Sequence, residues 1–242
     1  MKKLLFLFTA MSLLMFTVST ISAALIHKAP ILHSNTKEDE SNPPSPPFSK
    51  GGMGGLLEQE IYRIQKVYEG ISDIKGNFIQ KSHIKDLKRI DTYKGQFFIK
   101  RPMKMKWEYK GEMPQEVLIN NDEIIIYQKK ERQAFRGKFN RDTYGQAPIA
   151  LLSGFGRIHE EFYVSKKNGR FLLKPKRPMG GIVSIEIEPS EGEFPISSFT
   201  INDSRSNTIE VILKGVEVNT GLGDRLFEPS LPEDVKIYEY NL

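Results

Sequence analysis

Cysteine is absent from this 242-residue chain. Without it the fold has no disulfides, no thiol nucleophile and no cysteine to carry a lipid. The two histidines after residue 55, His83 and His159, have no companion at metal-ligand spacing. HExxH, GxSxG and a glycine-rich phosphate loop leading into a lysine are also missing. The sequence therefore predicts no metal, no cofactor and no enzyme, although paired carboxylates cannot be recognised in a single sequence.

A strong charge of either sign is lacking too. The formal net charge is +5, and residues 1–24 contain two lysines and no acid, so the rest of the chain has a surplus of only three basic side chains. That surplus is too small to predict nucleic-acid binding.

The first residues contain no charge after Lys3 until well past Ile21. A short basic start, an apolar run from Leu4 to Ile21 and the small residues Ser22-Ala23-Ala24 are typical of a cleaved secretory signal. A membrane anchor is the alternative, but no basic stop-transfer cluster follows the run. We expect residues 1–24 to be a signal peptide and the mature protein to be exported and soluble.

Residues 25–55 have few groups that could form a core. Four prolines occur at positions 43–47 and four glycines at positions 51–55. Such a composition predicts a disordered linker, although a proline-rich ligand for a partner domain is an alternative. Residues 56–242 then remain as a single domain.

The start of this domain has the period of a helix. Apolar residues spaced by three or four positions, with charges between them, predict an amphipathic helix with one buried face formed by Leu57, Ile61, Ile64, Tyr68 and Ile71. After it the pattern changes to short runs of β-branched and aromatic residues separated by turn residues, which predict antiparallel strands. Asn168-Gly169 indicates a tight hairpin, and Val183, Ile185 and Ile187 indicate the apolar face of one strand.

One segment interrupts the strands. Pro148 precedes Ile149, Leu151 and Leu152, and two glycines follow at Gly154 and Gly156. This pattern predicts a short apolar helix. The helix could plug one end of a barrel, which the pattern alone favours, or form a movable lid. A large antiparallel sheet that curls can enclose an apolar cavity, so a binding module is expected even before any family is considered.

The run "FFIKRPMKMKWEY", residues 97–109, resembles the periplasmic lipoprotein carrier family LolA, in which a strand ends in Arg-Pro and an aromatic residue follows. Four further motifs occur in the same order as in that family: "GNFIQK", "DEIIIYQ", "APIALLSG" and "FEPSLPEDVKI". The resemblance extends over essentially all of residues 56–242, and the linker has no counterpart in it.

The resemblance implies a mainly β fold, namely an incomplete, half-open antiparallel β-barrel closed by the N-terminal helix and a lid helix around an apolar cavity. It makes a lid the better interpretation of residues 147–156, with Arg101 and Pro148 in its gating. It places acyl chains against the apolar side chains Phe78, Phe98, Met105, Trp107, Ile149, Leu151 and Leu152. Met105 and Trp107 could equally be ordinary core residues. The lysines of this region, Lys100, Lys104, Lys106 and Lys110, could be exposed strand residues or could help to dock a partner.

The resemblance also implies a function. It is that of a monomeric periplasmic carrier that receives acylated lipoproteins from an inner-membrane ABC transporter resembling LolCDE and gives them to an outer-membrane receptor resembling LolB. The alternative is a related lipid-binding or envelope-stress sensor module of the RseB or MucB type.

Overall fold

The computed structural model describes residues 53–139, 158–179 and 181–240. Twelve strands form one sheet in the order β12-β6-β5-β4-β3-β2-β1-β11-β10-β9-β8-β7. Neighbouring strands are antiparallel except β12 and β6, which are parallel. The strands are β1 (Asp73–Ile84), β2 (Arg89–Lys100), β3 (Lys104–Lys110), β4 (Gln115–Asn120), β5 (Glu123–Gln128), β6 (Gln133–Lys138), β7 (Phe162–Lys167), β8 (Arg170–Pro175), β9 (Ile182–Pro189), β10 (Ile196–Asp203), β11 (Thr208–Val218) and β12 (Lys236–Tyr240).

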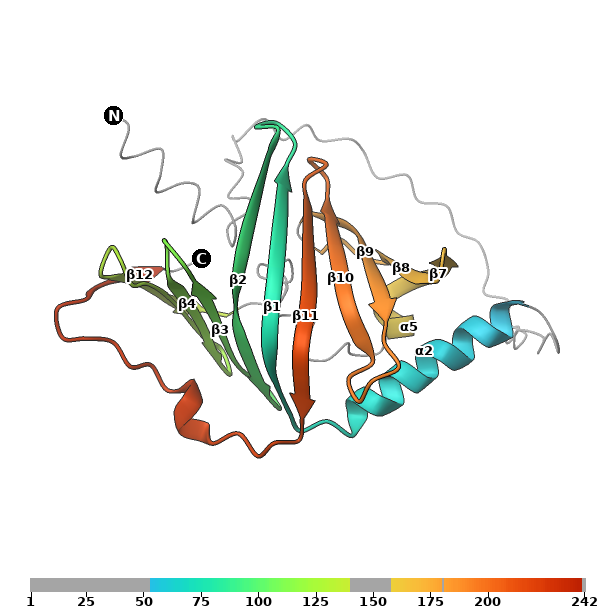
Figure 1. Ribbon diagram of the computed structural model, residues 1–242, viewed down its shortest axis with the longest axis horizontal. Helices are drawn as coiled ribbons and strands as arrows, with labels where there is room; N and C mark the ends of the chain where they lie inside the picture. The colour runs from blue at the N-terminus through green and yellow to red at the C-terminus, as the bar shows by residue number, and fades with distance from the viewer. Residues whose placement is uncertain (1–52, 140–157, 180, 241–242) are drawn as a thin grey trace, which may run out of the picture.

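The sheet is curved but not closed. Its edge strands β12 and β7 lie on opposite sides of the view in Figure 1 and do not pair with each other. This architecture confirms the predicted incomplete antiparallel barrel. The predicted lid helix lies outside the described residues; after that gap the chain continues with the short helix α5 (Ile158–Glu161). Within the described residues, no helix is both long and apolar enough to cross a membrane.

Helix α2 (Met53–Glu69) confirms the helix predicted from the period of its apolar residues. Ile61, Ile64 and Tyr68 are buried against the sheet, and the Tyr68 ring meets that of Phe194 edge-on at 5.3 Å. Its first turn lies at residues 53–55, which the sequence had assigned to the linker.

The hairpin turns follow the turn chemistry of the sequence. Asn168 and Gly169 have φ values of +52° and +81°, as the two-residue turn between β7 and β8 requires. Asn121, with φ of +58°, has the same role between β4 and β5.

Val183 corrects one prediction. It is 52 % exposed, whereas Ile182 and Ser184 on either side of it are buried. The register against β10 pairs Asn202 with Ser184 and then Asp203 with Ile182, so Val183 is the extra residue of a β-bulge. The expected alternation begins only at Ile185.

Apolar side chains form two clusters on the two faces of the sheet. The larger cluster lies on the inner face, where α2 also packs. The smaller cluster lies on the outer face of β4, β5 and β6. It is covered by residues 219–235, which connect β11 to β12, include the 3-10 helix η1 (Asp224–Phe227) and are called the outer strap below. Phe227 of the strap is fully buried in this cluster. In Figure 1 the strap is the red segment that runs from β11 towards β12.

Candidate functional site

The inner face of β2–β5 is a continuous apolar layer built from two registered rows of side chains. One row contains Ile99, Met105, Ile119 and Ile124, which are direct cross-strand partners. The next row, in the same registers, contains Phe97, Trp107, Val117 and Ile126. All eight residues are at most 7 % exposed. We call these two rows the inner layer.

Aromatic rings at the centre of the inner layer lie on one another. Trp107 stacks on Phe78 with a centroid distance of 4.2 Å and an interplanar angle of 28°, and on Phe97 at 5.3 Å and 27°. Tyr109 meets the Phe78 ring edge-on at 5.2 Å. These flat, polarisable surfaces contact aliphatic groups well without requiring one fixed shape.

Of the residues predicted to contact acyl chains, Phe78, Met105 and Trp107 lie in or against the inner layer and are buried. Phe98 does not lie there. Because successive side chains of a strand point to opposite faces, its neighbour Phe97 faces inward and Phe98 joins the outer cluster under the strap. The motif carried two adjacent phenylalanines, and the one assigned to the cavity is on the wrong face. Pro148, Ile149, Leu151 and Leu152 lie outside the described residues.

Arg101 lies in the turn between β2 and β3, at the edge of the inner layer, and is exposed. Its Nη1 is 3.5 Å from the backbone oxygen of Glu69, at the C-terminal end of α2, and its backbone N–H donates to the Ser72 oxygen at 3.0 Å. A cation at the C-terminus of a helix interacts favourably with the helix dipole. Burial raises the pKa of the Tyr68 phenol well above its usual value, and the charge of Arg101 opposes that rise. The carbonyl seen near Arg101 belongs to α2, whereas the lid segment that the resemblance pairs with Arg101 lies outside the described residues.

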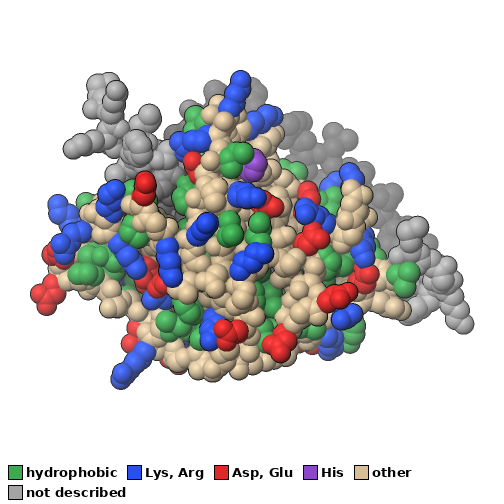
Figure 2. Space-filling model, in the orientation of Figure 1, with side chains coloured by type: hydrophobic (Ala, Val, Ile, Leu, Met, Phe, Trp, Pro, Cys, Tyr) green, Lys and Arg blue, Asp and Glu red, His purple; other side chains and the backbone are tan. Residues whose placement is uncertain are grey.

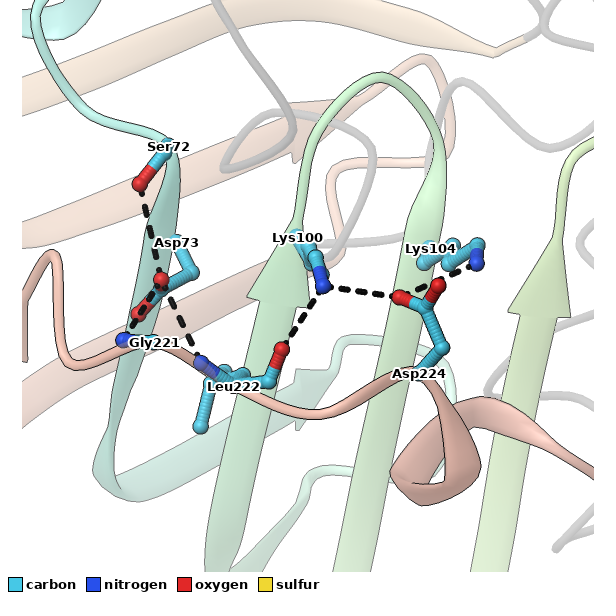
Figure 3. A network of polar contacts seen from close by, with 7 residues as sticks. All are labelled: Ser72, Asp73, Lys100, Lys104, Gly221, Leu222 and Asp224. Atoms are coloured by element: carbon cyan, nitrogen blue, oxygen red, sulfur yellow. Dashed lines mark hydrogen bonds and ion pairs between the residues drawn. The ribbon is translucent and has the colours of Figure 1, made fainter.

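A buried carboxylate fixes the junction between α2 and β1 to the outer strap (Figure 3). Asp73 Oδ1 accepts hydrogen bonds from the backbone N–H and the hydroxyl of Thr220, at 2.8 and 3.0 Å. Its Oδ2 accepts from the N–H groups of Gly221 and Leu222, at 3.0 and 3.4 Å. Ser72 N–H donates to Asn219 Oδ1 at 2.7 Å. We call this set of bonds the Asp73 clamp.

Lysine side chains continue the polar network along the same end of the sheet (Figure 3). Lys100 Nζ donates to the Leu222 oxygen at 2.7 Å and lies 2.7 Å from Asp224 Oδ1, to which Lys104 Nζ is 3.2 Å distant. The hydrogen bond from Lys100 and then that from Lys104 lower the pKa of Asp224. Lys106 and Lys110 also have partners, Glu108 and Gln96. Each of the four lysines thus has a polar or acidic partner on the outer face of the sheet. The face of the molecule seen in Figure 2 carries basic and acidic side chains side by side.

Replacing Asp73 by alanine is expected to lower the free energy of unfolding by about 2–4 kcal/mol, because the N–H groups of Thr220, Gly221 and Leu222 lose the carboxylate that they share. Burial raises the pKa of Asp73, but the hydrogen bonds from Thr220, Gly221 and Leu222 outweigh it, so that the pKa is below its usual value. The clamp therefore contributes its full stability above the unfolded-state pKa, and the contribution is lost as the pH falls through the folded-state pKa. Urea unfolding of wild type and Asp73→Ala at pH 7 and near pH 3 checks this. A stability difference of the same size at both pH values would contradict it.

Sequence reasoning did not find Asp73. A lone aspartate after a helix looks like any solvated turn residue, and its partners are nearly 150 positions away.

The described residues contain no group of three or more histidine, cysteine or acidic side chains placed to hold a metal ion. Asp73 is also the only charged side chain buried among them. The geometry of the described residues is that of a buried apolar layer with a clamped edge.

The described residues thus form an open antiparallel sheet with a helix on its apolar inner face. Residues 69–230 match the family model "Outer membrane lipoprotein carrier protein LolA", and the chain belongs to that family. Outer-membrane lipoprotein carrier proteins of Alkalilimnicola ehrlichii and Pseudomonas putida are 24 % and 25 % identical to it. These matches cover 77 % and 74 % of this chain and 88 % of each relative. A LolA superfamily protein of Nitrosomonas europaea aligns structurally over 72 % of this chain and 97 % of its own, with a TM-score of 0.46 and 8 % identity.

Proposed function

We propose that this protein is an exported carrier that holds the acyl chains of lipoproteins against its inner layer and delivers them to an outer-membrane receptor. The observation that carries the proposal is the membership of the LolA family together with an inner layer that is wholly apolar over two rows and several strands. In this proposal residues 1–24 direct export, residues 25–52 precede the folded domain, and the protein works as a periplasmic monomer without a cofactor and without catalysis.

The energetics explain why such a carrier needs this layer. Each methylene exposed to water costs about 0.8 kcal/mol, so an anchor with roughly 45 methylenes cannot cross an aqueous compartment unaided. Contact with Phe97, Met105 and Trp107 replaces contact with the bilayer by contact with another apolar surface. The exchange then needs little net free energy and can run in either direction, which suits a protein that both accepts and releases.

The proposed partners are an inner-membrane ABC transporter that supplies the lipoprotein and an outer-membrane receptor that takes it. Purification of the tagged protein from the periplasm of its own cell, followed by mass measurement of intact complexes, tests the function. Co-purified acylated proteins support the carrier. Free phospholipid without acylated protein would instead favour the lipid-binding or sensor module, and no bound lipid of any kind would contradict both.

Arg101 is proposed to oppose retention of the ligand. The guanidinium of Arg101 always carries a charge and needs hydrogen-bond acceptors. The carbonyl groups at the end of a helix supply such acceptors when that helix lies close to the sheet. Such bonds, at about 1.5–3 kcal/mol when one partner is charged, shift an open–closed equilibrium by roughly ten- to a hundred-fold. We expect Arg101→Leu to load normally and to transfer its lipoprotein to the receptor at least about tenfold more slowly.

Off-transfer from loaded carrier to membranes that contain the receptor measures this effect. Arg205→Leu, which changes an exposed arginine in the distant turn between β10 and β11, is the matched control. Normal transfer by Arg101→Leu would remove Arg101 from the mechanism. Failure to load would show that it is needed for folding or for uptake instead.

A further inference from the structure

The inner face changes from apolar to polar in a single step along the strands. Beyond the inner layer, on the side away from the Arg101 turn, the next row of cross-strand partners consists of Gly95, Tyr109, Gln115, Gln128 and Gln133. Three neighbouring strands therefore present a glutamine at the same level. Gln80 of β1 is joined to this row, because Tyr109 Oη donates to Gln80 Oε1 at 3.1 Å. We call Gln80, Tyr109, Gln115, Gln128 and Gln133 the amide rim.

The amide rim is not simply a solvated end of the sheet. Gln80 is 1 % exposed, Gln128 is 6 % exposed and Tyr109 is 7 % exposed. Burial raises the pKa of Tyr109, so the phenol stays neutral and able to donate. Every member is uncharged at neutral pH, which separates this site from the lysine pairs on the outer face.

Part of the hydrogen-bonding capacity of the rim is satisfied internally. Gln80 Nε2 donates to Ser82 Oγ at 3.2 Å, and Gln133 Nε2 donates to Gln128 Oε1 at 2.6 Å. Each amide has two N–H groups, so both glutamines keep a donor beyond these bonds.

Two further groups make no hydrogen bond within the described part of the chain. The half-buried amide of Gln115 is one of them. The other is the buried indole Nε1 of Trp107, which has no acceptor in hydrogen-bond geometry but lies close enough to the Tyr109 phenol to lower its pKa, against the larger effect of burial. A buried N–H without an acceptor is unfavourable, so these donors would gain from a carbonyl placed beside the rim.

We propose that the amide rim binds the ester and amide carbonyls that join the acyl chains to the lipoprotein, while the chains themselves lie on the inner layer. This inference rests on the proposed carrier function. Burying a carbonyl without a donor is costly, and the two apolar rows offer no donor except the Trp107 N–H, which lies at the rim. The rim supplies donors at one end of the chains and thereby orients the ligand. Its lack of charge suits neutral esters and amides rather than a phosphate group, which arginine or lysine would bind.

The test compares two lipopeptides of equal chain length, one with ester-linked chains and one with ether-linked chains that have no carbonyl. Their dissociation constants are measured on the mature protein by fluorescence of a labelled peptide. Loss of one well-placed hydrogen bond corresponds to about a tenfold change in affinity. We expect wild type to bind the ester about tenfold more tightly than the ether, and Gln115→Leu to reduce that preference to about twofold by weakening the ester complex alone.

Gln96→Leu is the matched control, because Gln96 lies on the outer face of β2, where its Oε1 accepts from Lys110 Nζ at 2.7 Å. It should keep the full preference. Trp107→Phe keeps a ring in the inner layer, removes the N–H and should show an intermediate preference. Equal binding of both lipopeptides by wild type, or an unchanged preference in Gln115→Leu, would overturn the role of the rim and leave the carrier function standing. Failure of wild type to bind either lipopeptide would overturn the carrier function itself.

Discussion

Gly95→Ala is expected to lower the free energy of unfolding by about 3–5 kcal/mol, one of the two largest effects anticipated in this protein. A β-carbon at position 95 would lie 1.8 Å from the backbone oxygen of Glu108 and 2.7 Å from the Phe78 ring. The ring could move, but the carbonyl belongs to the neighbouring strand β3 and can move only if the pairing of β2 with β3 changes. Strain of this kind distorts the inner layer as well as the strand.

Gly223→Ala is the control for this substitution. Gly223 has an ordinary φ of −72°, and a β-carbon there would meet nothing within 4 Å. Its stability should stay within about 0.5 kcal/mol of wild type. Urea unfolding of both variants at pH 7 gives the comparison. A loss below about 1 kcal/mol for Gly95→Ala would show that β2 and β3 are not held as closely as the structure indicates.

The second large effect is expected for Met105→Glu, which should reduce the affinity for a fluorescent fatty acid by at least about a hundredfold. Met105 is fully buried at the centre of one apolar row, between Ile99 and Ile119. A carboxylate there either remains charged in apolar surroundings or draws water into the surface that the chains would contact. The same substitution is expected to destabilise the fold, so binding is measured on protein whose thermal unfolding shows a folded population.

Two controls separate binding from folding. Met105→Leu preserves the apolar volume and should bind nearly as well as wild type. Val183→Glu places the same carboxylate at an exposed strand position and should change neither binding nor stability by a measurable amount. Wild-type affinity in folded Met105→Glu would mean that the ligand does not lie on this row.

Local patterns predicted the elements of this fold well. The period of Ile61, Ile64 and Tyr68 placed the N-terminal helix and its buried face, and Asn168-Gly169 placed a hairpin turn, because both depend on residues close together in sequence. The arrangement of these elements as a half-open barrel followed from the family resemblance rather than from the patterns. Phe78, Met105 and Trp107 are buried on the inner face, and their contact with acyl chains stays a prediction.

The failures have a common physical cause. Phe98 was assigned to the inner face because an apolar doublet in a strand does not show which member points inward; only the packing of the strap on the outer face decides it. Val183 was misplaced because a bulge shifts the alternation, and a bulge is fixed by the partner strand. Asp73 depends on partners in the outer strap, nearly 150 positions away, and the amide rim combines single side chains from five strands, so no local pattern marks either of them.

The positions of β11 and β12 in the sheet have a consequence for the order of folding. β11 forms the central seam with β1, joining Phe78 to Leu213, and β12 completes the opposite edge beside β6. Among the described strands, β11 is the only one that pairs with both halves, so residues 73–138 and residues 162–203 form one sheet only when residues 208–218 are present. Contacts of such long sequence separation form slowly. A chain that is synthesised from its N-terminus therefore keeps these two halves in separate sheets until β11 is complete.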